Sequence, residues 1–395
     1  MPMSFQTILD KPDLADQKVF LRLDLNVPLI DGQITDDYKI KASLPTIKLL
    51  LERGTKVIVV SHLGEPLVDG KLVAKAQDLF TLQPIAVSLS QLLGAPVKFI
   101  AGQDLASIKQ QISQATDKVV VLDNLRFWPG ELSNDPDFAK DLASLADYYV
   151  NDAFAVSHRR QASVAAIKDF LPSFSGRLLE REVNNLSRVL NPEQPLVVIL
   201  GGVKISSKIN LIRNLGQKAA KVLIGGGLAN NFLAAQGYNV GQSVVDQASI
   251  ELAGQLAKEL GEKLVIPSDV IVAAQDGQPA LRLANQVVAS DNILDIGPGT
   301  IQEFSRQIKT AKTIIWNGPL GKFEDEHYKN GTLFVAREIA WQSRGAAFGL
   351  VGGGETVAAV QMTQMSGYID WVSTAGGAML AFLGGEPMPG LEKII

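Results

Sequence analysis

Polar and charged side chains end the apolar runs in the first half of the chain, where they could bind a small anion. The short β-branched runs 18–23, 56–60, 119–122 and 148–150 lead into Asp24 and Asn26, His62, Arg126 and Arg159 respectively. Helix-like segments such as 42–52 and 84–93 separate these runs, and this alternation predicts a parallel sheet with helices on both faces. Ligands of such sheets bind beyond the carboxyl ends of the strands, so we expect these side chains to form one site.

Glycine replaces charge at the strand ends in the second half of the chain. The apolar run 196–200 leads into Gly201 and Gly202, and isoleucines then recur at helical spacing, with Ser206 or Ser207 as the expected N-cap. A strand, a glycine turn and a helix N-terminus form an anion site, because free N–H groups and the helix dipole point at the turn. Lys204 and Lys208 lie four residues apart and can share one face. The alternative interpretation is a surface helix with two solvated lysines.

Similar glycine-rich turns follow the apolar runs 221–224, 350–351 and 371–373. Four such turns within about two hundred residues favour phosphate or nucleotide binding, although glycines can also serve only to form turns. The turns match neither the phosphate-binding loop with a terminal Gly-Lys-Ser/Thr nor the Gly-x-Gly-x-x-Gly dinucleotide pattern. The sequence therefore predicts a nucleotide site without indicating NAD.

Composition limits the class of protein further. The 395 residues suggest two domains, and the net charge of −4 gives no polybasic pattern for nucleic acid or membrane binding. The chain has no cysteine, its first residues do not resemble a signal peptide, and its apolar runs are shorter than the ~20 residues of a spanning helix. We expect a cytoplasmic protein. The helical pattern 177–190 is the expected connector between domains 1–176 and 191–379.

A small-anion site and a nucleotide site on two domains suggest phosphoryl transfer accompanied by domain closure. Such transfer depends on positioning and charge stabilisation, and closure would exclude water as a competing acceptor. We expect Mg²⁺ to bridge the nucleotide phosphates and to be held by a carboxylate.

Seven motifs resemble the phosphoglycerate kinase family in order and spacing along essentially the whole chain. They occupy residues 21–28, 61–64, 124–127, 150–154, 201–204, 316–319 and 352–354. The resemblance implies an α/β fold of two Rossmann-like, parallel-sheet, three-layer domains joined by a helix. It also implies a monomeric kinase that exchanges phosphate between 1,3-bisphosphoglycerate and MgADP, giving 3-phosphoglycerate and MgATP. Residues 380–395 would pack back on the N-terminal domain.

The resemblance also implies roles for individual residues. The catalytic set would be Lys39, Lys204, Gly353 and Gly377. The phosphoglycerate would be bound by Asp24, Leu25, Asn26, Lys39, His62, Leu63, Gly64, Glu65, Arg126 and Arg159. ATP or ADP would be bound by Gly202, Lys204, Lys208, Gly226, Asn317, Glu324, Gly353, Gly354, Glu355 and Thr356, with Glu355 also at the metal.

Four positions depart from the family pattern, all of them near the chemistry. Lys39 and Glu65 stand where the family has arginines, Glu355 replaces an aspartate, and Ala375 replaces a glycine. A carboxylate at position 65 would repel the substrate phosphate. Since the family usually has a small residue at position 160, we hypothesise that Arg160 offsets Glu65 by pairing with it or by contacting the phosphate.

Two functions follow from this combination: an active phosphoglycerate kinase, or a catalytically weakened paralogue that binds ligands in a regulatory role. The lysines and arginines retained on both halves favour the first. Some polar residues have simpler interpretations. Asp24 and Asp152 could be strand-end hydrogen bonders or helix caps, and His327 a solvated loop residue.

Overall fold

The computed structural model describes residues 4–11, 13–102, 104–373 and 375–395. The chain forms two compact units. The N-terminal unit comprises Met1–Asn184 together with Met388–Ile395, and the C-terminal unit comprises Asn185–Pro387.

The N-terminal unit is built on a six-stranded sheet in the order β10-β9-β1-β4-β8-β7, and every pair of neighbouring strands is parallel. Its strands are β1 (Lys18–Arg22), β4 (Lys56–Val60), β7 (Val97–Ile100), β8 (Val119–Leu122), β9 (Tyr148–Asn151) and β10 (Ser173–Ser175). Its helices are α1 (Tyr38–Glu52), α2 (Ala76–Leu79), α3 (Gln83–Leu93), α4 (Leu105–Gln114), α5 (Pro129–Leu132) and α6 (Pro136–Ala143). Two hairpins, β2 (Leu29–Ile30) with β3 (Gln33–Ile34) and β5 (Leu67–Val68) with β6 (Lys71–Leu72), lie outside the sheet.

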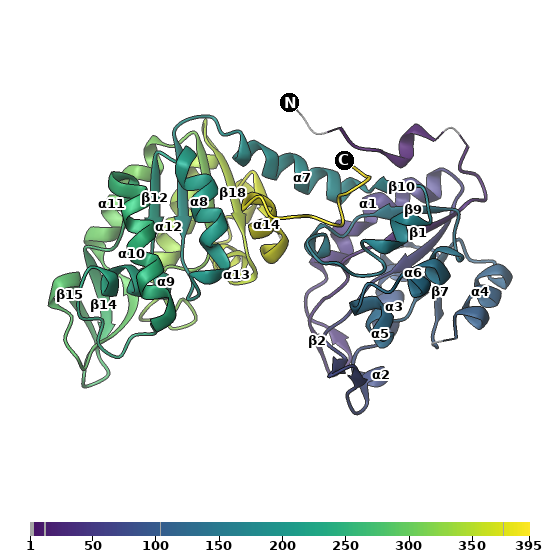
Figure 1. Cartoon of the computed structure of the whole chain (residues 1–395), viewed down its shortest axis with the longest axis horizontal. Coiled ribbons are helices and arrows are strands. Elements are labelled where there is room, and N and C mark those ends of the chain that lie inside the picture. Colours follow the sequence, from purple (N-terminus) through teal and green to yellow (C-terminus); the bar gives the residue numbers. More distant parts are fainter. Residues whose placement is uncertain (1–3, 12, 103, 374) are drawn as a thin grey trace. The chain divides into compact units, whose positions relative to one another are not determined.

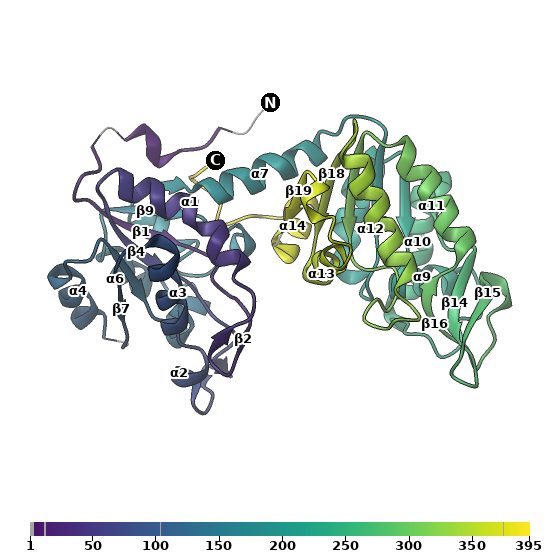
Figure 2. The same ribbon diagram turned by 180° about the vertical axis from the view of Figure 1, so that it is seen from behind.

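Strand alternation divides the apolar side chains of this unit between two cores. Val19 and Leu21 of β1 pack with residues of α1 and α3, whereas Phe20 packs with residues of α4 and α6. The reason is that successive strand residues point to opposite faces of the sheet. Helix α6 accordingly lies in front of the sheet in Figure 1, and α1 lies in front of it in Figure 2.

The C-terminal unit repeats the plan with the parallel order β13-β12-β11-β17-β18-β19. Its strands are β11 (Leu196–Leu200), β12 (Lys221–Ile224), β13 (Leu264–Val265), β17 (Thr313–Asn317), β18 (Phe348–Gly352) and β19 (Trp371–Ser373). Its helices are α8 (Ile209–Lys218), α9 (Gly226–Ala235), α10 (Ile250–Leu260), α11 (Pro298–Thr310), α12 (Asn330–Ser343), α13 (Gly354–Met362) and α14 (Gly376–Leu383). A small antiparallel sheet adds β14 (Asp269–Ala273), β15 (Pro279–Leu283) and β16 (Asn292–Ile296). The predicted fold class of two parallel three-layer domains is confirmed.

Helix α7 (Arg177–Leu190) has the bounds that the sequence predicts, and the division between the units falls inside it. Its first turn is capped by Asp152, whose Oδ1 accepts hydrogen bonds from the backbone N–H groups of Leu178 and Leu179 at 2.8 and 3.0 Å. The capping interpretation of Asp152 is therefore confirmed. Asp152 lies directly after β9, so its cap ties the start of α7 to the sheet of the N-terminal unit.

The last residues of the chain return to the N-terminal unit from Met388 onward. Asn151 donates to the carbonyl of Gly390 at 2.9 Å, and the Lys168 ammonium donates to the carbonyl of Glu392 at 2.7 Å. The sequence-based expectation placed the whole segment 380–395 there. In the structure Leu380–Leu383 instead complete α14, which packs against α8 in the C-terminal unit.

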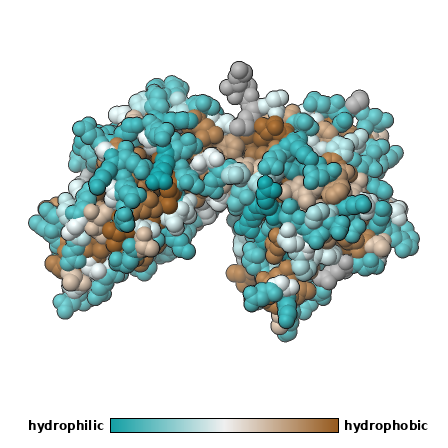
Figure 3. All heavy atoms as spheres, viewed as in Figure 1, coloured by the Kyte–Doolittle hydropathy of each residue, from teal (hydrophilic) through white to brown (hydrophobic). Residues whose placement is uncertain are grey.

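The surface of both units is mixed in character. Figure 3 shows hydrophilic side chains over most of the visible face of each unit, with smaller apolar areas between them. No helix among the described residues is long and apolar enough to cross a membrane.

Candidate active site

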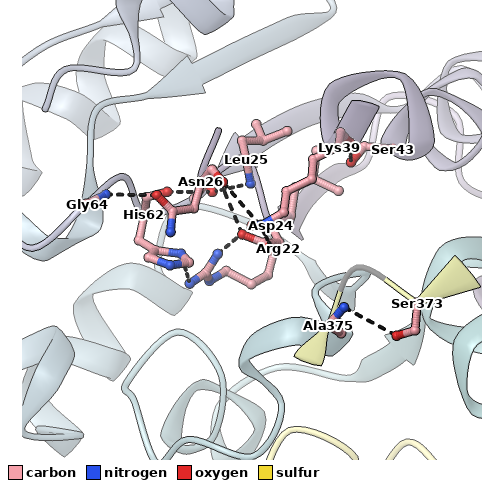
Figure 4. A network of polar contacts seen from close by, with 12 residues as sticks. Arg22, Asp24, Leu25, Asn26, Lys39, Ser43, His62, Gly64, Ser373 and Ala375 are labelled. Carbon is pink, nitrogen blue, oxygen red and sulfur yellow. Dashed lines mark hydrogen bonds and ion pairs between the residues drawn. The ribbon is translucent and has the colours of Figure 1, made fainter. Parts of the chain in front are cut away.

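Asp24 and Lys39 form the centre of the polar cluster in the N-terminal unit (Figure 4). Asp24 follows β1, and Lys39 lies in the first turn of α1. The Lys39 ammonium lies 2.7 Å from Oδ2 of Asp24 and donates to the carbonyl of Asn26 at 3.1 Å. Asn26 donates its backbone N–H to Oδ1 of Asp24 at 3.2 Å. Burial alone would raise the pKa of the Asp24 carboxyl, but the charge and hydrogen bond of Lys39, with the backbone N–H of Asn26, oppose it, and this pKa lies below its ordinary value. Asp24 is therefore ionised at neutral pH.

His62 is buried in the second position after β4, where it faces Arg22. Burial, followed by the charge of Arg22, lowers the pKa of His62 well below its ordinary value. Nη2 of Arg22 lies 3.4 Å from Nδ1 of His62, which accepts because a guanidinium can only donate. The imidazole is thus neutral at physiological pH, and it serves as a hydrogen-bonding group rather than as a charged one.

Arg22 itself is a site residue that our sequence-based assignment omitted. Its side chain is fully buried at the end of β1, and its Nε donates to the hydroxyl of Ser163 at 2.9 Å. The same hydroxyl donates to the buried carboxylate of Glu131 at 2.6 Å, and Arg22 is the main charge that opposes the burial-raised pKa of Glu131. An arginine inside an apolar strand pattern was the available signal, because a buried arginine requires partners.

The loop after β4 brings Gly64 and Glu65 to Arg126. Oδ1 of Asn26 accepts the backbone N–H of Gly64 at 3.0 Å (Figure 4), and Nη1 of Arg126 donates to the carbonyl of Gly64 at 2.6 Å. The same Nη1 lies 2.5 Å from Oε1 of Glu65. The pairing of Arg160 with Glu65 that we hypothesised is therefore wrong, because Glu65 pairs with Arg126. A contact of Arg160 with substrate phosphate stays a prediction.

The remaining phosphoglycerate residues surround this cluster. Leu25 donates its backbone N–H to the hydroxyl of Ser61 at 2.9 Å, and Leu63 donates to the side chain of Asn124 at 3.2 Å. Arg159 is exposed, and its charge lowers the pKa of Arg126. The N-terminal unit thus brings the expected residues together at the carboxyl edge of its sheet.

Three glycine turns of the C-terminal unit are joined by backbone hydrogen bonds. Gly202 donates to the carbonyl of Pro319 at 2.8 Å, Gly226 donates to that of Leu320 at 3.0 Å, and Leu228 donates to that of Gly202 at 2.6 Å. A Cβ at Gly201 would lie 2.0 Å from the carbonyl oxygen of Pro319. These glycines therefore allow a close approach between backbones, in addition to leaving room for a ligand.

Helix N-termini gather at these turns without side-chain caps. The residues that precede α9, α13 and α14 are Gly225, Gly353 and Ala375, and none of them forms a side-chain capping hydrogen bond. A Cβ at Gly376 would lie 3.0 Å from Cα of Gly353, so the first turns of α13 and α14 are neighbours. Helix N-termini without such caps present N–H groups and positive dipole ends to an anion.

One expectation about these helices requires correction, and one departure from the family pattern is accommodated by the backbone. Neither Ser206 nor Ser207 caps α8, which begins at Ile209 after a short 3₁₀ turn, and the hydroxyl of Ser207 donates to the carbonyl of Lys204. The methyl group of Ala375 is compatible with its backbone, because φ is −102° and needs no glycine. Thr374, which precedes it, lies outside the described residues.

A cavity of about 270 Å³ lies beside the glycine turns. Gly202, Gly226, Glu324 and Glu355 line it together with an apolar wall of Val244, Pro267, Val270, Ile293 and Leu320. This combination of an apolar wall and few polar groups suits a nucleoside. Asp295 also lines the cavity, and burial raises its pKa to about 7.

The other predicted nucleotide residues lie around the turns rather than in the cavity wall. Nδ2 of Asn317 donates to the carbonyl of Gly352 at 2.7 Å, and the hydroxyl of Thr356 accepts the N–H of Gly318 at 2.7 Å. Lys208 is buried, which lowers its pKa, while Glu355 opposes this shift. Lys204, Gly354 and Gly377 are exposed.

Glu355 is the predicted metal ligand. Among the described residues, no group of three or more His, Asp or Glu side chains could hold a metal ion. Glu355 lies in the first turn of α13 at the wall of the cavity. A single carboxylate beside a phosphate site fits Mg²⁺, which is commonly held by one or two carboxylates and the phosphates of a nucleotide.

His327 has no place in either cluster. It is exposed, and its Nδ1 lies 3.1 Å from Oδ1 of Asp325. Its interpretation as a solvated loop residue is confirmed.

Two parallel α/β units, one with a cationic cluster and one with open helix N-termini beside a cavity, define a phosphate-handling protein. The family model described as phosphoglycerate kinase matches residues 9–386. The chain is 42% identical over 402 residues to the phosphoglycerate kinase of Dictyoglomus turgidum, with 99% of each chain covered. It is 43% identical over 393 residues to that of Thermosipho africanus, with 97% of this chain and 96% of the relative covered.

Solved structures give the same result. The phosphoglycerate kinase structure from Coxiella burnetii superimposes with a TM-score of 0.86 at 37% identity, covering 99% of this chain and 98% of that one. The structure from Pyrococcus horikoshii gives a TM-score of 0.85 at 31% identity, with 98% of each chain covered. The chain therefore belongs to the phosphoglycerate kinase family.

Proposed function

We propose that this chain is an active phosphoglycerate kinase, in which the N-terminal unit binds the phosphoglycerate and the C-terminal unit binds the magnesium nucleotide. It transfers a phosphoryl group from 1,3-bisphosphoglycerate to ADP, and the reverse reaction consumes ATP. The observation that carries the nucleotide assignment is the set of helix N-termini without side-chain caps around the glycine turns.

In the N-terminal unit, Asp24 and Asn26 orient the glycerate hydroxyl and carboxylate. Arg126 and Arg159 neutralise the 3-phosphate, and neutral His62 contributes a hydrogen bond. The charge of Lys39 lies at the transferring phosphoryl group, where cations stabilise the developing charge. Support comes from the direct contacts of Lys39 with Asp24 and Asn26.

In the C-terminal unit, the apolar cavity wall holds the base and Glu324 binds the ribose hydroxyls. The N–H groups of Gly353, Gly354 and Gly377 bind phosphate oxygens, as do the ammonium groups of Lys204 and Lys208. Glu355 would hold Mg²⁺ from the chain, and the ion would neutralise charge on the nucleotide phosphates. We include in the proposal that the enzyme is monomeric and cytoplasmic.

The deciding experiment is a coupled assay of ATP consumption by the purified chain, with and without 3-phosphoglycerate. We expect turnover that requires 3-phosphoglycerate and is abolished by removing Mg²⁺ with EDTA. Binding of 3-phosphoglycerate should survive EDTA, because the N-terminal cluster needs no metal. No turnover above background with intact MgATP binding would contradict the proposal and support the weakened paralogue.

A further inference from the structure

The guanidinium of Arg126 has two edges with different environments. Its Nη1 carries both contacts, to the carbonyl of Gly64 at 2.6 Å and to the carboxylate of Glu65 at 2.5 Å. Its Nε and Nη2 are buried and have no hydrogen-bond partner in the described part of the chain. An anion from solvent therefore reaches Arg126 on the side of Nη1, where Glu65 already lies.

The two partners of this ion pair differ in exposure. The side chain of Arg126 is 2% exposed, whereas that of Glu65 is 69% exposed. A buried guanidinium without a counter-ion is costly, so Glu65 satisfies Arg126 while no ligand is bound. Glu65 can leave at little cost, because its own carboxylate gains hydration when it turns into solvent.

The surrounding charges explain why an anion is needed at this position. Burial is the largest cause that lowers the pKa of Arg126. The charges of Arg159 and Arg22 lower this pKa further, whereas the charge of Glu65 raises it. Glu131 compensates the buried Arg22, whereas Glu65 is the carboxylate in contact with Arg126. A phosphate dianion can replace Glu65 on Arg126 with a gain in charge compensation.

We propose that Glu65 is an affinity-determining residue that occupies the place of the substrate phosphate on Arg126 and must be displaced when 3-phosphoglycerate binds. This inference rests on the proposed function and adds a competing group to its substrate site. Because the competitor belongs to the same chain, it acts at every ligand concentration and weakens binding by a constant factor. In the ATP-forming direction the same effect speeds the release of 3-phosphoglycerate, which is the product.

Isothermal titration calorimetry on the full chain tests the proposal without turnover. The variants are Glu65→Gln, which removes the charge and keeps the shape, and Glu65→Ala, which also removes the contact. The matched control is Glu259→Gln, because Glu259 forms an exposed ion pair with Arg213 in the C-terminal unit. We expect both Glu65 variants to lower the dissociation constant of 3-phosphoglycerate about two- to fivefold, as the loss of a weak competing ion pair implies. The control should leave it unchanged, and no variant should alter MgATP binding.

The dependence of 3-phosphoglycerate binding on ionic strength provides a second readout. A purely structural role of Glu65 would not change this dependence. The Glu65 variants carry one more net positive charge at the site, so 3-phosphoglycerate binding should weaken more steeply with added KCl than in the parent chain. In the ATP-forming assay, product inhibition by 3-phosphoglycerate should become stronger.

The opposite results overturn the proposal. An unchanged or raised dissociation constant in both Glu65 variants, with the folded state verified by thermal melting, would mean that Glu65 orients Arg126 instead of competing for it. Failure of the proposed function is distinguishable, because the parent chain would then show no 3-phosphoglycerate-dependent turnover whatever the effect of Glu65.

Discussion

The two units hold their predicted ligand sites at the same edge of similar sheets, but with different chemistry. The N-terminal site consists of side chains that pair with one another, as Asp24 does with Lys39 and Arg126 with Glu65. The C-terminal site consists largely of backbone N–H groups at glycine turns, where side chains are absent. A site of paired side chains can change partners when its sequence changes, whereas a site of close backbones tolerates no added atom.

The departures from the family pattern illustrate this difference. Lys39 forms an ion pair with Asp24, and Glu65 forms one with Arg126, so the N-terminal cluster accommodates both substitutions. Ala375 is accommodated only because its φ of −102° is open to any residue. Gly318 and Gly353, at φ +92° and +102°, have no such freedom.

Gly318→Ala should have the largest effect on stability. The new Cβ would lie 2.4 Å from the carbonyl carbon and oxygen of Gly201, at a φ of +92°. We expect the free energy of unfolding to fall by about 2–4 kcal/mol through overpacking and backbone strain, and MgATP binding to weaken. Urea denaturation and calorimetry measure the two effects.

The matched control for that prediction is Gly277→Ala. Gly277 also has a positive φ, +76°, but no atom lies within 4 Å of its Cβ position. Only the conformational cost of about 1 kcal/mol should remain. Equal losses in the two variants would show that backbone strain, and not the close approach of the turns, dominates.

Asp295→Asn should change the pH dependence of stability. In the described part of the chain, Asp295 accepts hydrogen bonds only from the backbone N–H groups of Ile296 and Gly331. Burial raises its pKa to about 7, in contrast to the lowered pKa of Asp24. A pKa raised on folding stabilises the fold fully below the unfolded value of 3.8, and this contribution is lost as the pH rises through about 7. We expect Asp295→Asn to remove this loss, which is on the order of 2–4 kcal/mol.

The measurement is the free energy of unfolding at pH 5 and at pH 8 for the parent chain and the variant. The prediction is tested by how much the free energy of unfolding changes between pH 5 and pH 8. The absolute stability does not test it, because the asparagine amide changes one hydrogen bond at both pH values. An equal difference in parent and variant would show that Asp295 titrates at its ordinary pKa in the folded chain.

Lys39→Met should affect the N-terminal site. It leaves the nearly buried Asp24 without its ion-pair partner, and we expect a loss of about 1 kcal/mol in stability at pH 7, since Lys39 is partly exposed. The kcat/KM value for 3-phosphoglycerate should fall more than about tenfold, as expected when a cation at the transferring group is lost. Adding Asp24→Asn should recover the stability but not the activity, and recovery of both would assign Lys39 a purely structural role.

Lys39→Arg should have the smallest effect. A planar guanidinium can hold Asp24 and still present a fork to phosphate, so we expect kcat to rise a few-fold. Steady-state kinetics at saturating substrates measures the change. Loss of activity would show that the surrounding contacts to Asp24 and Asn26 are adapted to lysine.

The sequence by itself determined the fold class, the bounds of α7 and which residues lie at the strand ends. These follow from local periodicity, because apolar spacing specifies helices and strands and the carboxyl ends of parallel strands share one edge. For Asp152 the sequence left two interpretations open, a strand-end hydrogen bonder or a helix cap, and the hydrogen bonds to the first turn of α7 confirm the cap.

Only the tertiary structure decided which side chains meet. Glu65 pairs with Arg126, about sixty residues away, and not with Arg160, while Arg22 meets His62 across two neighbouring strands. Residues 380–383 stay in the C-terminal unit because α14 packs on α8, although the final residues return to the other unit. Two side chains pair when folding brings their polar atoms within hydrogen-bond distance. Local sequence spacing carries no information about the distance between residues that are far apart along the chain.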